Sequence, residues 1–168
     1  MTLETTRVKM VQDNSKSAHD YLVSLAIQYP YRIFQDETAV RREIEKIVQD
    51  LWIAYADGIP AGCAFLSYIE QYNIYTFDAY HDRNVTKSID NRVPWVYDAG
   101  KMLVPYILNH KSEILWSWHD VRNRAATIML KKLGFTDDGI RETIFGKYQI
   151  FYTRRDLWES KQRSLQRQ

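Results

Sequence analysis

The segment 115–135, LWSWHDVRNRAATIMLKKLGF, constrains the fold of this chain more than any other part of the sequence. An apolar run at 115–118 predicts a strand, and the polar residues 119–122 predict a turn. A helix is expected next, because apolar residues then recur at the i, i+3, i+4, i+7 spacing of one helix face. These residues are Ala126, Met129, Leu130 and Leu133. The segment therefore predicts a strand followed closely by a helix.

Both ends of this helix carry residue types that helix termini prefer. Asp120 or Asn123 can cap its start, because either side chain can accept hydrogen bonds from the free N–H groups of the first turn. Gly134 can end it, since the left-handed backbone of a helix stop leaves little room for a Cβ. The helix is expected to end there.

The rest of the chain alternates between strand and helix patterns. Further strands are predicted over residues 6–12, 51–56, 61–68, 74–80, 140–144 and 148–153. Further helices are predicted over 18–29, over 37–48 and from Pro94, with Pro105 ending or kinking the last of these. Hairpin turns are expected at Asp57-Gly58 and Gly146-Lys147, and a loop over residues 81–91. This order predicts an α/β domain.

Composition agrees with a single globular domain. The chain has 168 residues, 45% of them hydrophobic and 26% charged, and it can bury a sizeable core. A net charge of +2 is too small to indicate a nucleic-acid partner by itself. The single cysteine, Cys63, lies in an apolar run and is interpreted as a core residue. No run resembles a signal peptide or a membrane span, so a reducing intracellular setting is expected.

The helix of segment 115–135 carries a recognisable pattern, Asn-x-x-Ala and then Lys-x-Gly-Phe. Its residues are Asn123, Ala126, Lys132, Gly134 and Phe135. This pattern resembles the last helix of the GNAT acyltransferases, and the predicted element order from about residue 6 to 153 is similar to that of the family. The resemblance implies an α/β domain over 1–153 with a mixed, mostly antiparallel sheet and helices on both faces. It also implies that the strands 74–80 and 115–118 are parallel neighbours, which diverge to admit the pantetheine arm of acetyl-CoA.

This chain differs from the usual GNAT pattern at two positions that concern the cofactor, and the resemblance also indicates which residues would bind it. GNAT enzymes usually bind the cofactor pyrophosphate with a glycine-rich turn after the fourth strand, but this chain has no glycine there before Gly100. Many members have a tyrosine that protonates the departing thiolate at the position of Leu130, which has no proton to give. If the protein is an enzyme, acetyl-CoA is the expected cofactor, without tight binding. The candidate residues are Arg83, Lys87, Trp116, Trp118 and Asn123.

Three residues are candidates for catalysis. His81 follows the strand 74–80 and His119 follows the strand 115–118, so both are expected beside the same cleft, where an imidazole can act as a base. Asp78 lies within a strand, where a buried carboxylate needs a partner or a function. Solvated histidines and a solvent-facing carboxylate are the alternatives. Together with Asp82 and Asp120, the histidines match no metal-binding spacing, so no metal is expected.

A narrower resemblance points to small GNAT-like proteins grouped with the internal virion or assembly proteins of short-tailed phages. Its residues are Leu115-Trp116, Trp118, Val121, Asn123, Leu130, Gly58, Pro60 and the segment 146–151, GKYQIF. The resemblance implies a virion or assembly role with weak or lost acyl transfer, in the host cytoplasm or the virion. An N-acetyltransferase that transfers an acetyl group from acetyl-CoA to an amine is the alternative.

The C-terminal segment 154–168 differs in character from the domain before it. It carries five cations against two acidic residues, for a charge of +3. These residues are Arg154, Arg155, Lys161, Arg163 and Arg167 against Asp156 and Glu159. A partner chain, such as another virion protein, is expected to bind Arg154–Gln168 with Trp158 as the anchor. Nucleic acid is a weaker possibility, and a solvated tail is the alternative.

Overall fold

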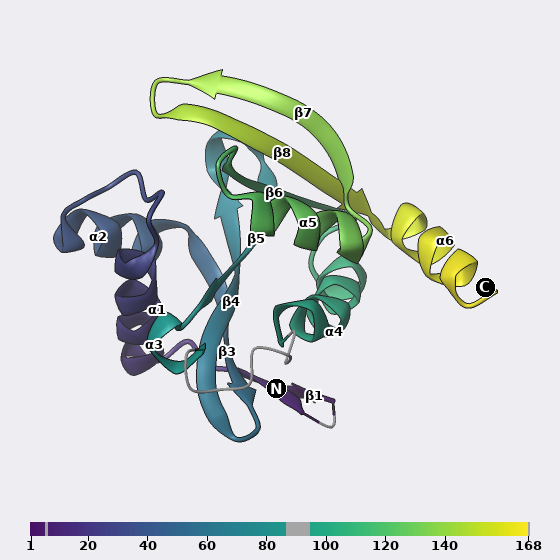
Figure 1. Ribbon diagram of the computed structural model, residues 1–168, viewed down its shortest axis with the longest axis horizontal. Coiled ribbons are helices and arrows are strands. Elements are labelled where there is room, and N and C mark those ends of the chain that lie inside the picture. Colours follow the sequence, from purple (N-terminus) through teal and green to yellow (C-terminus); the bar gives the residue numbers. More distant parts are fainter. Residues whose placement is uncertain (6, 87–94, 168) are drawn as a thin grey trace.

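The computed structural model describes residues 1–5, 7–86 and 95–167. Within these residues lies one eight-stranded sheet, with the strand order β1-β2-β3-β4-β5-β6-β8-β7 (Figure 1). The strands are β1 (Thr2–Glu4), β2 (Val8–Gln12), β3 (Val48–Ala56), β4 (Ile59–Ile69), β5 (Ile74–His81), β6 (Ile114–Asp120), β7 (Thr136–Thr143) and β8 (Gly146–Arg154). Neighbouring strands are antiparallel except β5 and β6, which are parallel. The expected mixed, mostly antiparallel sheet is confirmed.

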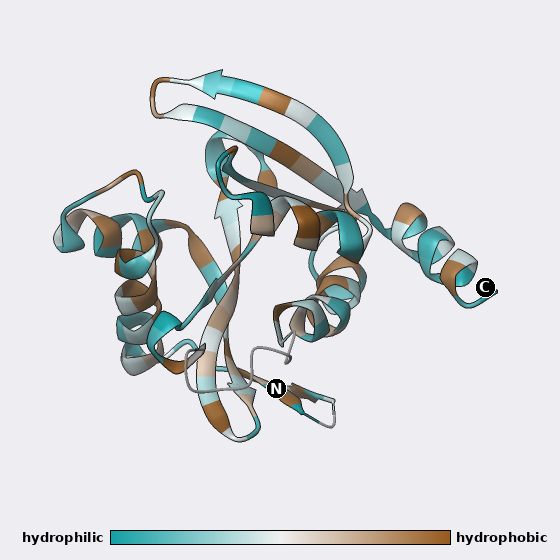
Figure 2. Cartoon of the chain, in the orientation of Figure 1, coloured by the Kyte–Doolittle hydropathy of each residue, from teal (hydrophilic) through white to brown (hydrophobic). Residues whose placement is uncertain are grey.

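Helices cover both faces of this sheet. They are α1 (Lys16–Gln28), α2 (Glu37–Ile47), α3 (Arg83–Thr86), α4 (Trp95–His110), α5 (Arg124–Leu133) and α6 (Arg155–Leu165), and a single 3₁₀ turn spans Glu70–Tyr72. One core cluster joins α1 and α2 to the sheet, and a larger one joins α4, α5 and α6 to its other face. In Figure 2, α2 and α6 are mostly hydrophilic, with hydrophobic residues only at intervals, as expected for helices on a domain surface.

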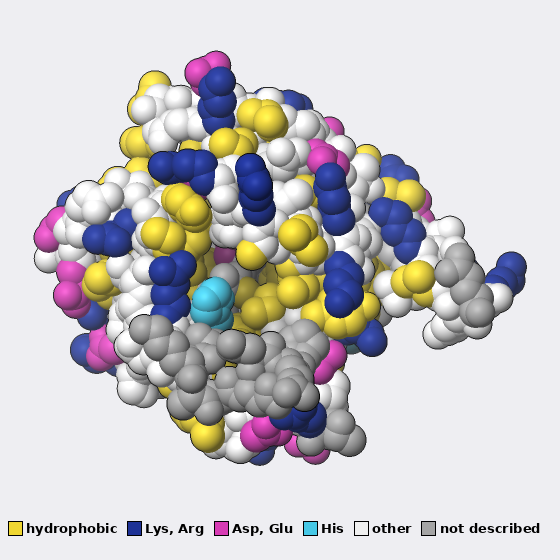
Figure 3. All heavy atoms as spheres, viewed as in Figure 1, with side chains coloured by type: hydrophobic (Ala, Val, Ile, Leu, Met, Phe, Trp, Pro, Cys, Tyr) yellow, Lys and Arg dark blue, Asp and Glu magenta, His cyan; other side chains and the backbone are white. Residues whose placement is uncertain are grey.

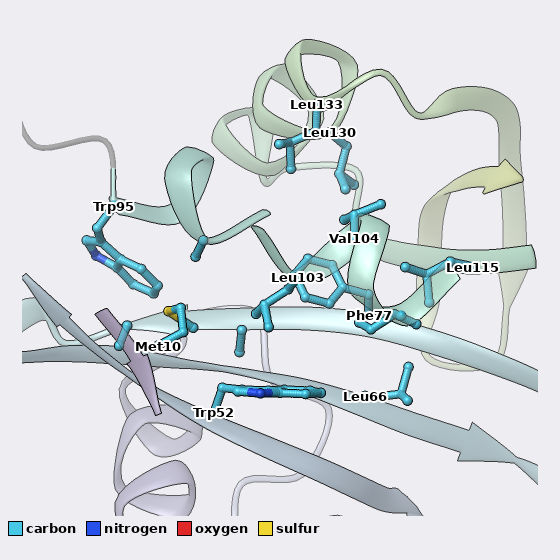
Figure 4. Packing of buried hydrophobic residues seen from close by; sticks show 14 of the residues in the cluster. Met10, Trp52, Leu66, Phe77, Trp95, Leu103, Val104, Leu115, Leu130 and Leu133 are labelled. Carbon is cyan, nitrogen blue, oxygen red and sulfur yellow. The ribbon is translucent and has the colours of Figure 1, made fainter. Parts of the chain in front are cut away.

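Strand alternation explains how one sheet serves two cores. Successive side chains of a strand point to opposite faces, so Leu51 and Ile53 of β3 join the α1–α2 cluster while Trp52 joins the other. Trp52 is fully buried. Figure 4 shows it on the sheet side of the larger core, with Leu103 and Val104 of α4 on the helix side. The sheet therefore holds its shape through packing on both faces.

Helix boundaries follow the expected capping chemistry. The side chains of Ser15 and Asp36 accept hydrogen bonds at the starts of α1 and α2. Of the two candidates for α5, Asn123 is the cap, and Asp120 is the last residue of β6. Gly134 ends α5 with a φ of 93°, as expected for a left-handed helix stop.

Several predicted boundaries were wrong. The strand β1 was missed, and the predicted loop after β5 contains the short helix α3. Pro105, expected to end or kink α4, does not end it, because the helix continues to His110 with buried residues on both sides of the proline. The hairpin turns at residues 144–145 rather than at Gly146-Lys147. There the hydroxyl of Thr143 accepts from Phe145 N–H and donates to the Gly146 carbonyl, which stabilises the earlier turn.

The C-terminal segment forms α6, which is held against the domain. Trp158 is 6% exposed and belongs to the larger core, and Arg155 donates hydrogen bonds to the Leu108 carbonyl of α4. Lys161 donates to the Gly134 carbonyl at the end of α5. The expectation that Trp158 anchors a partner is therefore corrected, because its side chain already packs in the core of this chain.

Candidate active site

The strands β5 and β6 meet at one residue pair and then diverge. Thr76 pairs with Trp116, and no later pair joins the two strands. Each strand is held on its other side, because β4 pairs with β5 as far as His81 and β8 pairs with β6 as far as Asp120. The gap between β5 and β6 therefore lies between two well-paired strands and does not result from disorder at the edge of the sheet. The prediction of parallel, diverging neighbours is confirmed.

A cleft of about 290 Å³ occupies this gap, here named the β5–β6 cleft. Its apolar wall comes from β5, α4 and α5, and its polar groups come from β5, β6, the end of α1 and the start of α5. The apolar residues include Phe77, Val96, Ala126, Met129, Leu130 and Leu133. Figure 3 shows a hollow with a hydrophobic floor and several Lys and Arg side chains around its margin. Such a site suits a ligand with an apolar chain and anionic groups.

Asp78 is the carboxylate in this cleft. It lies on β5 one residue after Phe77, so its side chain points to the α1–α2 face of the sheet while Phe77 points to the other. It is partly buried, and it has no hydrogen-bond or ion-pair partner in the described part of the chain. Burial raises the pKa of Asp78 to about 7, because the ionised form loses hydration without a compensating cation. The group can therefore exchange a proton at neutral pH.

Tyr29 brings a phenol to the same cleft from the end of α1. The amide Nδ2 of Asn123 donates a hydrogen bond to the Tyr29 hydroxyl over 2.9 Å. The Tyr29 ring packs edge-on against Tyr80 and Tyr31, with ring centroids 5.5 and 5.6 Å away. Burial raises the pKa of Tyr29 to about 12, although the Asn123 hydrogen bond opposes the rise, so the phenol keeps its proton at neutral pH.

The two candidate histidines have different surroundings. His81 is exposed and lines the cleft at the end of β5, where burial of part of the ring and the Arg83 charge lower its pKa. His119 also lines the cleft but is buried, and its ring stacks on Phe151. Its Nε2 lies 2.8 Å from the Thr127 hydroxyl, and burial lowers its pKa. Both imidazoles are therefore biased toward the neutral form.

Asp120 is committed to an ion pair instead of capping α5. Its carboxylate accepts two hydrogen bonds from the Arg122 guanidinium, each 2.8 Å long. The same Arg122 contact holds the pKa of Asp120 below its usual value. The guanidinium lies 4.8 Å from the Tyr31 ring centroid, where the ring face attracts a cation. No group of three or more His, Cys, Asp or Glu within the described ranges could hold a metal ion.

Similar architectures occur among solved acetyltransferase structures. A probable GNAT acetyltransferase from Chromobacterium violaceum has a TM-score of 0.68 and 14% identity, over 94% of this chain and 93% of that one. A GCN5-related N-acetyltransferase from Brucella melitensis has a TM-score of 0.67 and 15% identity, over 99% and 84%. The RimL ribosomal L7/L12 α-N-protein acetyltransferase in complex with coenzyme A has a TM-score of 0.67 and 9% identity, over 94% and 99%.

The chain has the GNAT fold. At these identities the likeness concerns the fold alone. No protein-family model matches the sequence, and no curated protein matches it closely enough to count as a relative. No helix in the described residues is both long enough and apolar enough to cross a membrane.

Within the GNAT fold, only some of the candidate cofactor-binding residues line the cleft. Trp118 and Asn123 line the β5–β6 cleft. Trp116 does not line it and packs against Tyr152 of β8, with ring centroids 5.3 Å apart. Arg83 begins α3 and is not part of the cleft lining. Lys87 lies outside the described residues.

The sequence pattern missed Tyr29 as a site residue. The spacing of Tyr29 after Leu22 and Leu25 predicts a position on one face of the helix expected over 18–29, so this spacing gives no sign of a role in a cleft. Tyr29 lies just past the end of α1, where the backbone turns extended and the ring enters the cleft. The Tyr-Pro pair at 29–30 was the available signal, since a residue before proline disfavours helical backbone.

Proposed function

We propose that this protein is an N-acyltransferase that transfers an acetyl group from acetyl-CoA to an amine, with Asp78 as the general base. The observation that carries the proposal is a carboxylate inside a cleft made by two diverging parallel strands, with no hydrogen-bond or ion-pair partner among the described residues. The GNAT fold of the chain supports it.

The residues of the cleft suit the pantetheine part of an acyl-CoA. Beyond Thr76, the edge of β5 that faces β6 has no partner among the described strands, so its N–H and C=O groups can pair with an extended chain that carries amide groups. The apolar side chains of α4 and α5 suit the methylene groups of that chain. Bound acetyl-CoA would supply the activated acyl group. The described residues show no glycine turn for the pyrophosphate, so weak binding remains our prediction.

Asp78 would prepare the acceptor amine. An ammonium group beside the carboxylate loses its proton to Asp78, and the neutral nitrogen then attacks the thioester carbonyl. A pKa near 7 suits this role, because much of the carboxylate is ionised at neutral pH while its affinity for a proton remains high. His81 at the rim of the cleft is the alternative base.

Thiol release from acetyl-CoA in the presence of a panel of primary amines tests the proposal. We expect amine-dependent release by the wild-type chain, and a loss of kcat/KM of about 10²-fold or more in Asp78→Asn. The control is Asp57→Asn. Asp57 is an exposed turn residue with a φ of 50°, a conformation that asparagine adopts readily, so this variant should behave like the wild type. Absence of both acetyl-CoA binding in calorimetry and amine-dependent release would refute the proposal.

A second candidate function is a virion or assembly role in a short-tailed phage, in the host cytoplasm or the particle. Two features favour it: Leu130 in place of a proton donor, and the apolar turn of the β7–β8 hairpin. Ile144 and Phe145 of that turn are 93% and 57% exposed, which suits contact with another virion protein. The charged side chains of α6 would add polar contacts. Co-sedimentation with particles that Ile144→Ser abolishes is the expected outcome for this role.

A further inference from the structure

The Tyr29 hydroxyl keeps a proton that no described protein group accepts. The Asn123 side chain has a fixed orientation, because its Oδ1 accepts the hydrogen bond from Ala126 N–H that caps α5. Its Nδ2 must then face Tyr29 and donate to the phenolic oxygen. The Tyr29 proton therefore points elsewhere, and the structure shows no hydrogen-bond acceptor for it in the described part of the chain.

The Tyr29 ring is held in place by its neighbours, just as its hydroxyl is held by Asn123. Tyr80 and Tyr31 pack against Tyr29 at interplanar angles of 63° and 83°, so two aromatic contacts restrain the ring. Tyr29, Asp78 and Leu130 all line the β5–β6 cleft, and Leu130 is a hydrocarbon on the opposite, α5 side. Tyr29, Tyr80 and Ser117 bring hydroxyl groups to the cleft lining. Among the described residues, Tyr29 is the one of these three whose hydroxyl oxygen accepts a side-chain hydrogen bond.

We propose that Tyr29 donates its hydroxyl proton to the sulfur that leaves the acyl donor, and that Asn123 holds it in position to do so. This inference rests on the proposed acyl transfer. Asp78 first passes the proton that it took from the ammonium group to solvent, so its carboxylate is ionised again. The neutral amine nitrogen then forms a bond to the thioester carbonyl carbon, and its excess proton passes to Asp78. The C–S bond then breaks, and its electron pair stays on sulfur, which takes the phenolic proton. The phenolate regains a proton from the Asp78 carboxylic acid through solvent, so the products are an amide and a neutral thiol.

The hydrogen bond from Asn123 suits the proton-donor role. A thiol in solution has a pKa of about 8.5, whereas burial raises the pKa of Tyr29 to about 12, so complete transfer of the phenolic proton to a free thiolate is uphill. The developing phenolate is stabilised by the Asn123 N–H, whereas the thiolate leaves into a cleft with an apolar wall, where a charged sulfur becomes more basic. Both effects reduce the difference between the pKa of the phenol and that of the leaving thiol.

A comparison of two acyl donors distinguishes a proton-donor role of Tyr29 from a purely structural role. With acetyl-CoA, Tyr29→Phe should lower kcat/KM by about 10²-fold while leaving the dissociation constant of acetyl-CoA within about 2-fold. With an S-acetyl aromatic thiol, whose thiolate is stable without a proton, the same variant should stay within about 5-fold of the wild type. The control is Tyr72→Phe, which removes a hydroxyl from a ring that is 64% exposed and outside the cleft lining, and it should match the wild type.

Asn123→Asp tests the positioning. Aspartate caps a helix as well as asparagine does, so the melting temperature should not fall. Its carboxylate has no N–H to donate, so it accepts the Tyr29 proton, and the loss should resemble that of Tyr29→Phe with both donors.

Three results would overturn the inference. They are full activity of Tyr29→Phe with acetyl-CoA, an equal loss with both donors, and full activity of Asn123→Asp. In each of them an active wild type leaves the proposed function intact. A wild type that neither binds nor consumes acetyl-CoA refutes the proposed function, and the role of Tyr29 with it.

Discussion

Asn123 at the start of α5 and Tyr29 just past the end of α1 are hydrogen-bonded across 94 positions of the sequence. One amide thus caps a helix with its oxygen and orients a phenol with its nitrogen. The bond also ties the two sides of the sheet together, because α1 and α5 cover opposite faces. The local start of α5 and the geometry of the candidate site therefore depend on the same side chain.

The pH dependence of acyl transfer should report Asp78. As a base it is active when deprotonated, so kcat/KM should rise with pH through a midpoint near its pKa of about 7. In Asp78→Asn this rise should disappear along with most of the activity. His81→Ala should keep the same midpoint, because its pKa is lowered and its ring lies at the exposed end of β5. A midpoint that moves in His81→Ala and stays in Asp78→Asn would assign the base to His81.

Asp78 should also destabilise the fold at high pH. Its pKa is raised from 3.8 in the unfolded reference to about 7, so the folded state binds this proton more tightly and the free energy of unfolding falls between about pH 4 and pH 7. Asp78→Asn should therefore be more stable than the wild type at about pH 8, by about 1–3 kcal/mol, and similar to it at about pH 4. Urea denaturation at both pH values measures the difference. Equal stability at the higher pH would mean that the carboxylate is well hydrated.

Gly100 should set the spacing between α4 and α5. A Cβ at this position would lie 2.6 Å from Leu133 Cδ1, and Leu133 is buried in the larger core. Gly100→Ala should lower the free energy of unfolding by about 1–2 kcal/mol, because overpacking outweighs the gain in helix propensity. Lys101→Ala, at the exposed neighbouring position, serves as the control and should have little effect. Thermal unfolding compares them, and a stabilised Gly100→Ala would show that Leu133 moves aside freely.

Removal of α6 should destabilise the domain. Trp158 is 6% exposed in the larger core, so Trp158→Ala should cost about 3–5 kcal/mol, and truncation after Thr153 at least as much. Truncation after Leu165 keeps the helix whole and is the control. Urea denaturation of the three variants tests the prediction. An unchanged urea unfolding transition after loss of residues 154–168 would show that this segment is a solvated tail that does not stabilise the domain.

Local sequence patterns predicted much of the fold and part of the site. The spacing of apolar residues, the capping side chains and Gly134 define α5, and strand order is enough to bring β5 and β6 together. Asp78 was found because a carboxylate within a strand is unusual. The contact of Tyr29 with Asn123 was not predictable in this way, since it depends on how α1 and α5 approach one another through the sheet. The tertiary packing of Trp158 was missed for the same reason, because its local surroundings are charged.

The single pairing of Thr76 with Trp116 divides the sheet into two plates, β1–β5 and β6–β8, and the line along which β5 faces β6 is here called the seam. Within each plate the strands are paired along their length, whereas the seam is bridged mainly by helix packing and by the Asn123–Tyr29 bond. Widening the seam beyond this pair therefore disrupts no further strand pairing. A long, thin molecule can enter between the plates by displacing side chains, and the sheet remains intact around it.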